Sequence, residues 1–413
     1  MAEKRLSLCM VTSFYPPYYF GGDAMHVYRL SNALARRGHE VTVVHSVDAY
    51  WAVGGPPPVG EFPNEPGVTV VPLSTRVPLA SALTTYLSGR PGLLAEELRS
   101  VLDYGSFDVI NYHFVSLLGG PHALSYGTGV KLYTLHEHWL VCPMQTLWKD
   151  NREVCLRPRC FRCSLSYRRP PQLWRYTRLM ERSLAHVDLF LAPSAFAAEE
   201  HARRGLDLSV RVLPYFLPDE PVPAPPGGAA PRVVPQRPYF LYVGRLERLK
   251  GVQTLLDVFA RYDAADLVIA GDGHYDEPVR EAAARLPHVH YLGFLHPSAL
   301  RELYAGALAV LLPSLGYETF GVVALEAFAE GTPVIARDRG ALSEVVAASG
   351  GGLTYRSDDD LVAAMDRLRC DEELQRSLAT RGQQALRERW SEEAHVGQYF
   401  EAIETARARR ALR

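Results

Sequence analysis

The chain has 413 residues, of which 47% are hydrophobic and 22% charged, a composition that indicates a globular protein and excludes a disordered one. Its formal net charge of -2 excludes a general electrostatic attraction to nucleic acid or anionic lipid. This length is sufficient for two domains of ordinary size.

The N-terminal half begins with the pattern of a parallel, doubly wound α/β sheet. An apolar run at residues 6–11 predicts a strand, and apolar residues at helical spacing follow between residues 27 and 34. Residues 41–44 predict the next strand, so the order is strand, helix, strand, as at the start of a Rossmann-like domain. Further strands are expected at residues 68–72, 108–111, 131–134 and 189–192.

The composition changes abruptly at residues 217–238, where closely spaced prolines exclude a helix or a central strand. We expect a linker here, stiffened by its prolines, between an N-terminal domain of residues 1–216 and a C-terminal domain of residues 239–390. Residues 391–413 predict one helix, which we expect to cross back to the N-terminal domain. Strands of the second domain are expected at residues 239–243, 266–270, 288–291, 309–312 and 333–336.

Two carboxylates, Glu318 and Glu326, flank the start of an apolar helix that follows the buried-type strand at residues 308–312. The N-terminus of such a helix offers free backbone N–H groups and a partial positive charge, which suit a phosphate group. One carboxylate in the entry loop and another two turns along the helix can hold sugar-type hydroxyls around that phosphate. The pattern therefore favours a site for a phosphorylated sugar compound.

A second loop of this half carries two cations. Gly244 follows the strand at residues 239–243 and allows a sharp turn of the backbone. Arg245 and Lys250 then lie at the carboxyl edge of the predicted sheet, where open α/β sheets bind their ligands. Arginine suits forked contacts to phosphate oxygens, and lysine acts as a mobile point charge. A solvated basic loop is the alternative, but the nearby glutamate pair favours phosphate binding.

The set formed by Glu318, Phe320, Gly321 and Glu326 resembles the Glu-x7-Glu element of the retaining glycosyltransferases of family 4, also called group 1. The resemblance extends over nearly the whole chain and is strongest at residues 242–346. It implies the GT-B fold, in which two Rossmann-like α/β/α domains face each other across a cleft. It also implies transfer of a hexosyl unit from a UDP- or GDP-sugar to an acceptor hydroxyl, in cell-surface glycan or natural-product glycoside synthesis.

The resemblance implies a role for each matched residue of the second domain. Arg245 and Lys250 neutralise the donor diphosphate, and Glu326 binds the ribose hydroxyls. Glu318 contacts sugar hydroxyls as a catalytic residue, while Phe320–Gly321 offers backbone N–H groups. Because two cations and a helix N-terminus supply the positive field, no catalytic metal is expected.

In the first domain, Gly22 lies in a glycine pair that resembles the N-terminal glycine loop of the family, where the backbone approaches the donor phosphate. Asp23 stands where the family usually has an aliphatic residue, which puts the acceptor contacts in doubt. His136, after the strand at residues 131–134, is similar to the family's active-site histidine, here followed by Glu137. Its implied catalytic role is to hydrogen-bond the sugar near the anomeric carbon.

Two other histidines of this domain, His113 and His138, are interpreted as structural. No residue in the sequence is placed where it must act as a nucleophile, so two retaining mechanisms stay open. One forms a covalent sugar–enzyme intermediate, and the other keeps the leaving and attacking groups on one face, with the leaving phosphate as base. The resemblance implies the second.

Four of the six cysteines, Cys142, Cys155, Cys160 and Cys163, fall within 22 residues. Four thiolates in one loop can close a tetrahedral zinc site, although the spacing is irregular. We predict a structural zinc in this Cys-rich loop, residues 142–163, beside the acceptor entrance. An iron–sulfur cluster, a redox pair and four unlinked cysteines are the alternatives.

Arginine and aromatic residues alternate at residues 167–179, a mixture that suits a membrane surface or an anionic acceptor. A solvated helix face is the alternative. Nucleic acid is disfavoured because the chain has no overall positive charge. No run of about 20 apolar residues and no signal-peptide pattern is present. We expect a cytoplasmic protein, in peripheral contact with the inner membrane face, whose acceptor is a small molecule, a lipid-linked sugar or an oligosaccharide.

Three other functions fit parts of the pattern. A nucleotide-sugar epimerase on the same fold needs no acceptor, and the loop at residues 142–178 argues against it. A nicotinamide oxidoreductase is disfavoured because the Gly-x-Gly-x-x-Gly fingerprint is absent after the first strand. A non-catalytic protein that binds a sugar nucleotide stays open. The sequence favours a retaining glycosyltransferase.

Overall fold

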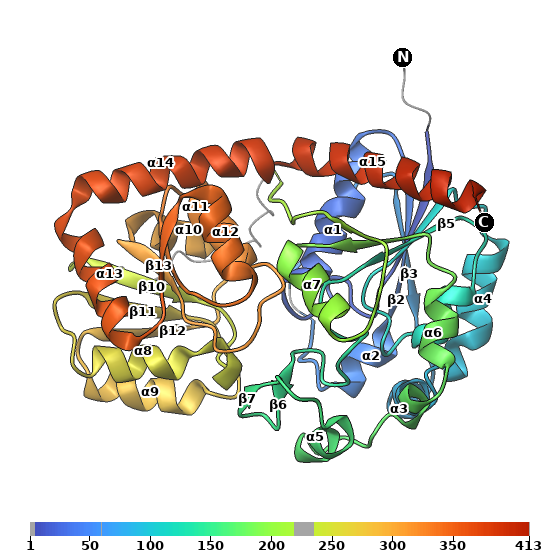
Figure 1. Ribbon diagram of the computed structural model, residues 1–413, viewed down its shortest axis with the longest axis horizontal. Helices are drawn as coiled ribbons and strands as arrows, with labels where there is room; N and C mark the ends of the chain where they lie inside the picture. The colour runs from blue at the N-terminus through green and yellow to red at the C-terminus, as the bar shows by residue number, and fades with distance from the viewer. Residues whose placement is uncertain (1–4, 59, 219–234, 413) are drawn as a thin grey trace. The chain divides into compact units, whose positions relative to one another are not determined.

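The computed structural model describes residues 5–58, 60–218 and 235–412, and these residues form two compact units (Figure 1). The first unit contains the residues up to Gln145, then Arg159–Pro218 and the C-terminal helix from Glu392. The second contains Thr146–Pro158 and the described residues from 235 to Ser391. Most of the predicted linker, residues 219–234 of 217–238, lies outside the described residues.

The first unit is built on a seven-stranded sheet in the order β3-β2-β1-β4-β5-β8-β9, with every neighbouring pair parallel. The order runs one way from β1 to β3 and the other way from β4 to β9, so the topological switch point lies between β1 and β4. The strands are β1 (Ser7–Val11), β2 (Glu40–Ser46), β3 (Val68–Leu73), β4 (Val109–Tyr112), β5 (Val130–Thr134), β8 (Leu189–Ala192) and β9 (Val210–Val212).

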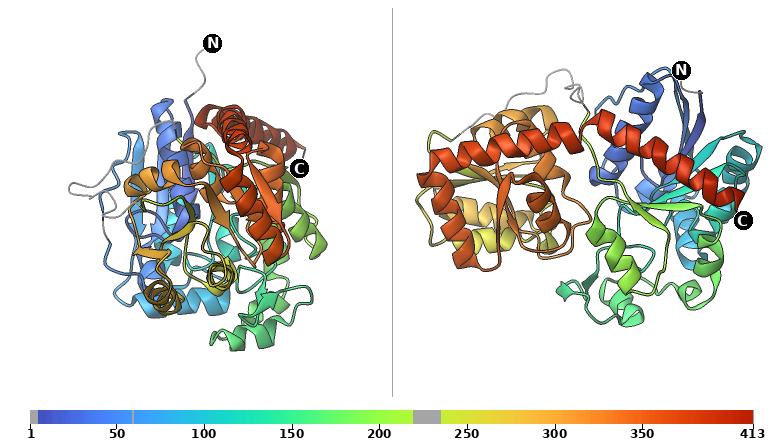
Figure 2. Two further views of the ribbon diagram at one scale, coloured as in Figure 1. Left: turned by 90° about the vertical axis from the view of Figure 1, so that its left-hand side faces the viewer. Right: turned by 45° about the horizontal axis from the view of Figure 1, so that its top comes forward.

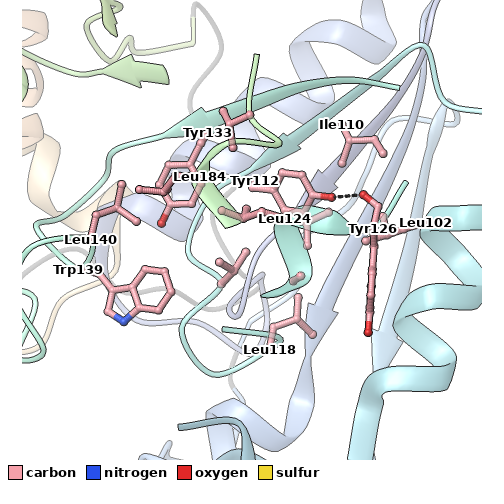
Figure 3. Packing of buried hydrophobic residues seen from close by; sticks show 14 of the residues in the cluster. Leu102, Ile110, Tyr112, Leu118, Leu124, Tyr126, Tyr133, Trp139, Leu140 and Leu184 are labelled. Carbon is pink, nitrogen blue, oxygen red and sulfur yellow. Dashed lines mark hydrogen bonds between the residues drawn. The ribbon is translucent and has the colours of Figure 1, made fainter. Parts of the chain in front are cut away.

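Helices cover both faces of this sheet because its strands are apolar on both sides. One face packs against the cluster that Figure 3 shows, where the Tyr112 hydroxyl donates a hydrogen bond of 2.7 Å to the carbonyl of Tyr126. The other face packs against α1 and α15. The helices are α1 (Gly21–Arg36), α2 (Val47–Ala52), α3 (Pro78–Ser88), α4 (Ala95–Tyr104), α5 (Cys160–Ser166), α6 (Leu179–Leu184), α7 (Ala195–Arg203) and α15 (Glu392–Ala411).

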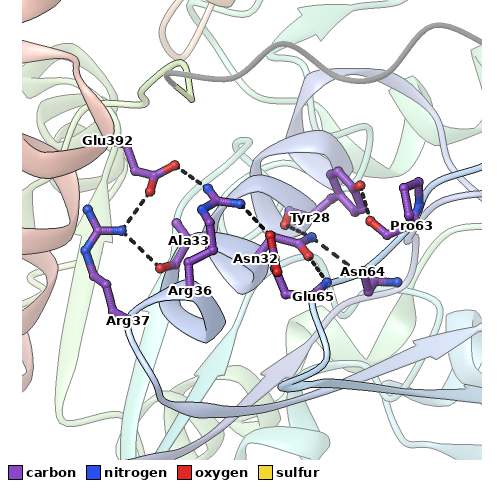
Figure 4. A network of polar contacts seen from close by, with 9 residues as sticks. All are labelled: Tyr28, Asn32, Ala33, Arg36, Arg37, Pro63, Asn64, Glu65 and Glu392. Carbon is purple, nitrogen blue, oxygen red and sulfur yellow. Dashed lines mark hydrogen bonds and ion pairs between the residues drawn. The ribbon is translucent and has the colours of Figure 1, made fainter.

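The C-terminal helix α15 belongs to the first unit, where it lies along β5 and α1 (Figure 2). An ion-pair network around the buried Glu392 carboxylate fixes its first turn (Figure 4). The Glu392 carboxylate is 2.5 Å from the guanidinium of Arg36 and 2.7 Å from that of Arg37, both at the end of α1. The carboxylate at a helix N-terminus and the arginines at a helix C-terminus also complement the two helix dipoles. The network therefore stabilises the end of α1 and the start of α15 together.

The second unit has a six-stranded parallel sheet in the order β12-β11-β10-β13-β14-β15. Counted along the chain, this is the 3-2-1-4-5-6 order of a Rossmann sheet, and its switch point lies between β10 and β13. The strands are β10 (Tyr239–Val243), β11 (Asp266–Ala270), β12 (Val289–Gly293), β13 (Ala309–Leu312), β14 (Val334–Arg337) and β15 (Gly352–Tyr355).

Seven described helices pack on this sheet, and a short antiparallel hairpin, β6 (Trp148–Lys149) and β7 (Glu153–Val154), also belongs to the second unit. The hairpin, β9 and β15 are elements that the sequence pattern did not predict. The two Rossmann-like domains confirm the predicted α/β fold class. The helices are α8 (Val252–Phe259), α9 (Asp276–Arg285), α10 (Pro297–Gly306), α11 (Val322–Ala329), α12 (Ala341–Ser349), α13 (Asp358–Cys370) and α14 (Glu372–Arg389).

Candidate functional site

The loops after β10 and β13 meet at the switch point of the second unit. The backbone N–H groups of Leu315 and Gly316 both donate to the carbonyl of Leu249, over 2.8 and 2.9 Å. Gly251 has a φ of +78°, and a Cβ atom at this position would come within 2.1 Å of the Pro313 carbonyl oxygen. Only glycine satisfies both conditions. The two loops are thus held in one fixed arrangement at the carboxyl edge of the sheet.

This arrangement places Lys250 and Glu318 in direct contact. The Lys250 ammonium donates to both carboxylate oxygens of Glu318, over 2.7 and 2.9 Å, and the Ser314 hydroxyl donates to one of them over 2.6 Å. Burial opposes ionisation of Glu318, but the Lys250 charge and these hydrogen bonds outweigh it and hold the carboxyl pKa below its ordinary value. Glu318 is therefore an ionised, oriented hydrogen-bond acceptor.

Arg245 lies in the same loop and is more accessible, with 56% of its side chain exposed against 25% for Lys250. Its backbone carbonyl accepts a hydrogen bond of 2.9 Å from the buried Tyr242 hydroxyl, and its guanidinium pairs with Glu247 over 2.9 Å. The backbone of Gly271 packs closely against this loop, because a Cβ atom on Gly271 would lie 1.9 Å from the Gly244 carbonyl oxygen. The loop is therefore rigid at its backbone while the guanidinium can reach an anion from solvent.

The N-terminus of α11 follows directly after Glu318. Gly321 is the N-cap residue with a φ of +118°, and the buried ring of Phe320 meets Trp390 edge-on at 6.1 Å between centroids. The first N–H groups of a helix have no acceptor within it, so they favour an anion at this end. Glu326 lies on the same helix, where its carboxylate accepts a hydrogen bond of 2.9 Å from the Tyr304 hydroxyl.

In the first unit, His136 follows β5 and lies in a buried chain of hydrogen-bonding side chains. Its Nε2 atom is 2.8 Å from Nδ1 of His113, and its Nδ1 atom is 2.5 Å from the Tyr215 hydroxyl. The ring of His26, on α1, lies 5.5 Å from that of His136 and 4.6 Å from that of Tyr215. His113 follows β4, so the switch point between β1 and β4 is beside this cluster.

Burial lowers the pKa of His136 to about 3, and burial together with neighbouring histidines lowers the pKa of His26 and His113. His136 is therefore a neutral imidazole, which has one donor and one acceptor nitrogen. Both nitrogens already have partners in the protein. A hydrogen bond from the ring to a sugar must replace one of these contacts.

The sequence interpretation of His113 as structural does not include its contact with His136, and no sequence pattern indicates the contact of Tyr215. A signal for His113 was present, because it follows its strand in the way that His136 follows the neighbouring one. No sequence signal pointed to Tyr215, which is 79 residues away along the chain. His138 has no such contact with His136, and its ring lies 5.4 Å from that of His201.

Two acidic residues lie near this cluster. Burial and the charge of Asp23 raise the pKa of Glu137 well above its ordinary value, while Arg175 opposes the increase. One buried carboxyl oxygen of Glu137 has no hydrogen-bond partner among the described residues. Gly22 is exposed in the first turn of α1, next to Asp23.

The structure does not support the predicted zinc site. Cys160 and Cys163 lie on α5, Cys142 lies in the turn after His138, and Cys155 follows the β6–β7 hairpin in the second unit. Across the described ranges 5–58, 60–218 and 235–412, no group of three or more His, Cys, Asp or Glu side chains is arranged to hold a metal ion. A structural zinc held by Cys142, Cys155, Cys160 and Cys163 therefore stays a prediction.

None of the helices in the described part of the chain combines the length and the apolar character that crossing a bilayer requires.

Two Rossmann-like domains, one with cations and a helix N-terminus at its switch point, define a two-domain α/β protein of the GT-B class. Two family descriptions match the chain: "Glycosyltransferase Family 4" at residues 20–220 and "Glycosyl transferases group 1" at residues 230–385. The chain belongs to the family 4, or group 1, glycosyltransferases, as the resemblance implied.

Individual proteins agree with this assignment. An uncharacterized glycosyltransferase of Methanocaldococcus jannaschii is 37% identical over 140 residues, which cover 32% of this chain and only 35% of that relative. Among solved structures, sucrose-phosphate synthase from Thermosynechococcus elongatus has a TM-score of 0.72 and 20% identity, with 97% of this chain and 100% of that chain covered. Anabaena HepE in complex with UDP-glucose has a TM-score of 0.65 and 15% identity, with the same coverage. These two likenesses show the fold.

Proposed function

We propose that the protein is a retaining glycosyltransferase that moves a hexosyl unit from a UDP- or GDP-sugar to an acceptor hydroxyl. The observation that carries the proposal is the contact of Lys250 with Glu318, directly before the N-terminus of α11 at a sheet switch point. A cation, an ionised carboxylate and free N–H groups suit a phosphorylated sugar. Family membership and the fold shared with a protein that binds UDP-glucose support the same ligand class.

In the proposed reaction, the acceptor hydroxyl oxygen forms a bond to the anomeric carbon as the bond from that carbon to the donor phosphate breaks. The hydroxyl proton passes to the leaving phosphate oxygen, so both groups stay on one face and the configuration is retained. Arg245, Lys250 and the α11 N-terminus stabilise the charge that develops on the diphosphate. Glu318 accepts hydrogen bonds from sugar hydroxyls, and Glu326 accepts them from the ribose.

In the first unit, His136 hydrogen-bonds the sugar near the anomeric carbon, and Gly22 allows close approach of the backbone to the donor phosphate. The Asp23 and Glu137 carboxyl groups lie in the same region and provide acceptors for hydroxyl groups. We propose a small-molecule, lipid-linked or oligosaccharide acceptor and a location in the cytoplasm, at the inner membrane face.

Calorimetric titration with UDP-, GDP-, ADP- and dTDP-sugars, with and without a chelator, tests the donor site. We expect micromolar binding of one donor that survives chelation. Glu326→Ala weakens this binding, whereas His136→Ala leaves it unchanged and lowers turnover. Full activity of both variants in a transfer assay contradicts the assignment of these residues.

Product analysis separates the remaining reactions. NMR of the anomeric proton in the early product shows whether the configuration of the donor is kept, and inversion contradicts the proposed mechanism. Conversion of the donor sugar without an acceptor indicates an epimerase. Donor binding without any turnover indicates a non-catalytic binding protein.

A further inference from the structure

Helix α3 of the first unit has its bulky apolar side chains on the outside. Leu79, Leu83 and Leu87 recur every four residues, so they form one row along the helix, and they are 68%, 44% and 43% exposed. The opposite, buried face carries Ser81 and Thr85, whose hydroxyl oxygens have no hydrogen-bond partner among the described residues. A surface helix ordinarily has the reverse pattern.

This orientation of α3 is fixed by its neighbours. The Trp174 indole nitrogen donates a hydrogen bond of 2.9 Å to the carbonyl of Tyr86, near the end of the helix. Gly89, the C-cap residue, has a φ of +67°, and a Cβ atom there would come within 2.8 Å of the Trp174 ring. The helix therefore cannot rotate to bury its leucines without breaking these contacts. Exposed apolar rows of this kind mark interaction sites.

The chain around α3 is strongly basic although the protein as a whole is not. Residues 74–95 contain two arginines and no acidic residue, and residues 159–182 contain seven arginines and one glutamate. The charge of the exposed Arg169 opposes the rise in the pKa of Tyr86 that burial causes, which places this cation beside α3. The formal net charge of the whole chain is -2, so the positive charge is concentrated here.

Further apolar side chains are exposed in the same basic segment. Trp174, which anchors α3, lies in a 3-10 turn whose first and last residues, Leu173 and Tyr176, are 64% and 65% exposed. On α5, Phe161 and Leu165 lie one turn apart and are also exposed. Because α3 contacts this 3-10 turn, the row on α3 and the exposed residues of the turn are neighbours, and together with the arginines of residues 159–182 we call them the α3 surface.

We propose that the α3 surface docks on the surface of an anionic lipid bilayer. Leucine and aromatic side chains insert among the lipid chains, and the arginines contact lipid phosphates. The charge decides the occupant, because a second copy of this chain would bring the same positive surface and repel it. The proposal stands on the surface alone and does not depend on the proposed transfer activity.

Co-sedimentation with vesicles tests this docking. We use vesicles of phosphatidylcholine alone and of phosphatidylcholine mixed with phosphatidylglycerol in equal parts. We expect the protein to bind the mixed vesicles at least about tenfold more tightly than the neutral ones, and added salt to weaken the binding. Equal affinity for both vesicles, or no binding to the anionic ones, overturns the proposal.

Two variants separate the apolar and the charged contributions. Leu79→Ser/Leu83→Ser/Leu87→Ser removes the row, and because these side chains are exposed the fold is expected to persist, which circular dichroism checks. Arg168→Glu/Arg169→Glu reverses two exposed charges. Each is expected to lower affinity for anionic vesicles about tenfold or more. The proposal fails if both bind like the wild type.

Matched controls lie elsewhere in the chain. Arg387→Glu/Arg389→Glu on α14 changes the net charge equally, and Val212→Ser removes an exposed apolar side chain on β9, the sheet edge opposite β3. Both are expected to bind vesicles normally. Sedimentation velocity without lipid measures the oligomeric state and so tests whether a second chain occupies the α3 surface. A dimer that dissociates in the leucine variant shows that a second chain occupies the surface and overturns the proposal.

Discussion

Both sheets have a switch point in their strand order, and the side chains gathered beside the two switch points have opposite chemistry. In the second unit, Lys250 and Glu318 form an ion pair whose side chains keep 25% and 19% of their surface exposed. In the first unit, His136 and Tyr215 form a hydrogen-bonded neutral pair, and both residues are almost completely buried. Sheet topology therefore decides where a ligand site forms, and burial decides whether that site is ionic or neutral.

The difference follows from the cost of desolvation. A charge stays ionised where a counter-ion and some water remain, as at Glu318, whereas an imidazole deep in an apolar shell loses its proton. An ionic switch point suits a diphosphate, and a neutral one suits hydroxyl groups. The following predictions test this contrast, in order of decreasing effect.

Lys250→Met removes the cation of the ionic switch point and leaves the Glu318 carboxylate without its main partner. We expect kcat/KM for transfer to fall about 100- to 1,000-fold, the usual cost of losing one preorganised electrostatic contact. Steady-state kinetics measure this, and Lys250→Arg should recover part of the loss. Arg301→Met, which breaks the more exposed ion pair with Glu330, is the control and should change kcat/KM by less than about twofold.

Acidification should destabilise the first unit before the second. The folded pKa values of His136 and His395 are about 3 and about 4, below the ordinary 6.5. The unfolded chain therefore takes up protons as the pH falls below 6.5, and the stabilising contribution present above that pH is lost on the way down to the folded pKa. Between about pH 7.5 and about pH 5.5, each histidine should lose about 1.4 kcal/mol of unfolding free energy.

Peptide-resolved hydrogen exchange, corrected for the intrinsic pH dependence, measures this loss in each unit. The second unit should lose less over this range, because burial lowers the pKa of fewer of its described histidines, namely His296, and because the pKa of Glu318 is lowered so that its contribution is lost only in stronger acid. His395→Gln should make the loss of unfolding free energy in the first unit smaller by about 1.4 kcal/mol, the contribution of one histidine. Equal losses of unfolding free energy in the two units would contradict the contrast between a neutral first site and an ionic second site.

Tyr215→Phe removes one hydrogen-bonding partner of His136 while keeping the ring. We expect kcat to fall about tenfold and the donor dissociation constant to stay unchanged, because one buried hydrogen bond is worth about 1.4 kcal/mol. Tyr399→Phe is the matched control: it removes another buried hydroxyl of this unit, which accepts from Asn111 over 3.3 Å. A loss of donor affinity in Tyr215→Phe would place this tyrosine in the donor site instead.

Tyr304→Phe removes the hydrogen bond that orients Glu326. We expect the donor to bind about fivefold more weakly, which corresponds to about 1 kcal/mol, with little change in kcat. Calorimetric titration measures the affinity. Tyr239→Phe removes a buried hydroxyl that donates 2.9 Å to the carbonyl of Leu303, on the same helix as Tyr304, and should leave donor affinity unchanged. If both variants bind equally, the role given to Glu326 is wrong.

The sequence was informative wherever structure follows from local patterns. The strands at residues 239–243, 266–270 and 309–312 were predicted with the bounds that the structure has, because continuous apolar runs are typical of buried parallel strands. It failed at β9 and β15, which lie at sheet edges and have mixed burial. At an edge, pairing with a neighbour decides the strand, and the local pattern is weak.

By itself, the sequence determined the two Rossmann-like domains and the residue types at their carboxyl edges, because strand runs and Gly-rich loops are local signals. The tertiary structure alone decided which side chains meet. Lys250 and Glu318 are 68 residues apart, and His136 and Tyr215 are 79 apart. It also turned the leucines of α3 outward. Contacts across such separations depend on how strands are ordered and helices packed, which no local pattern encodes.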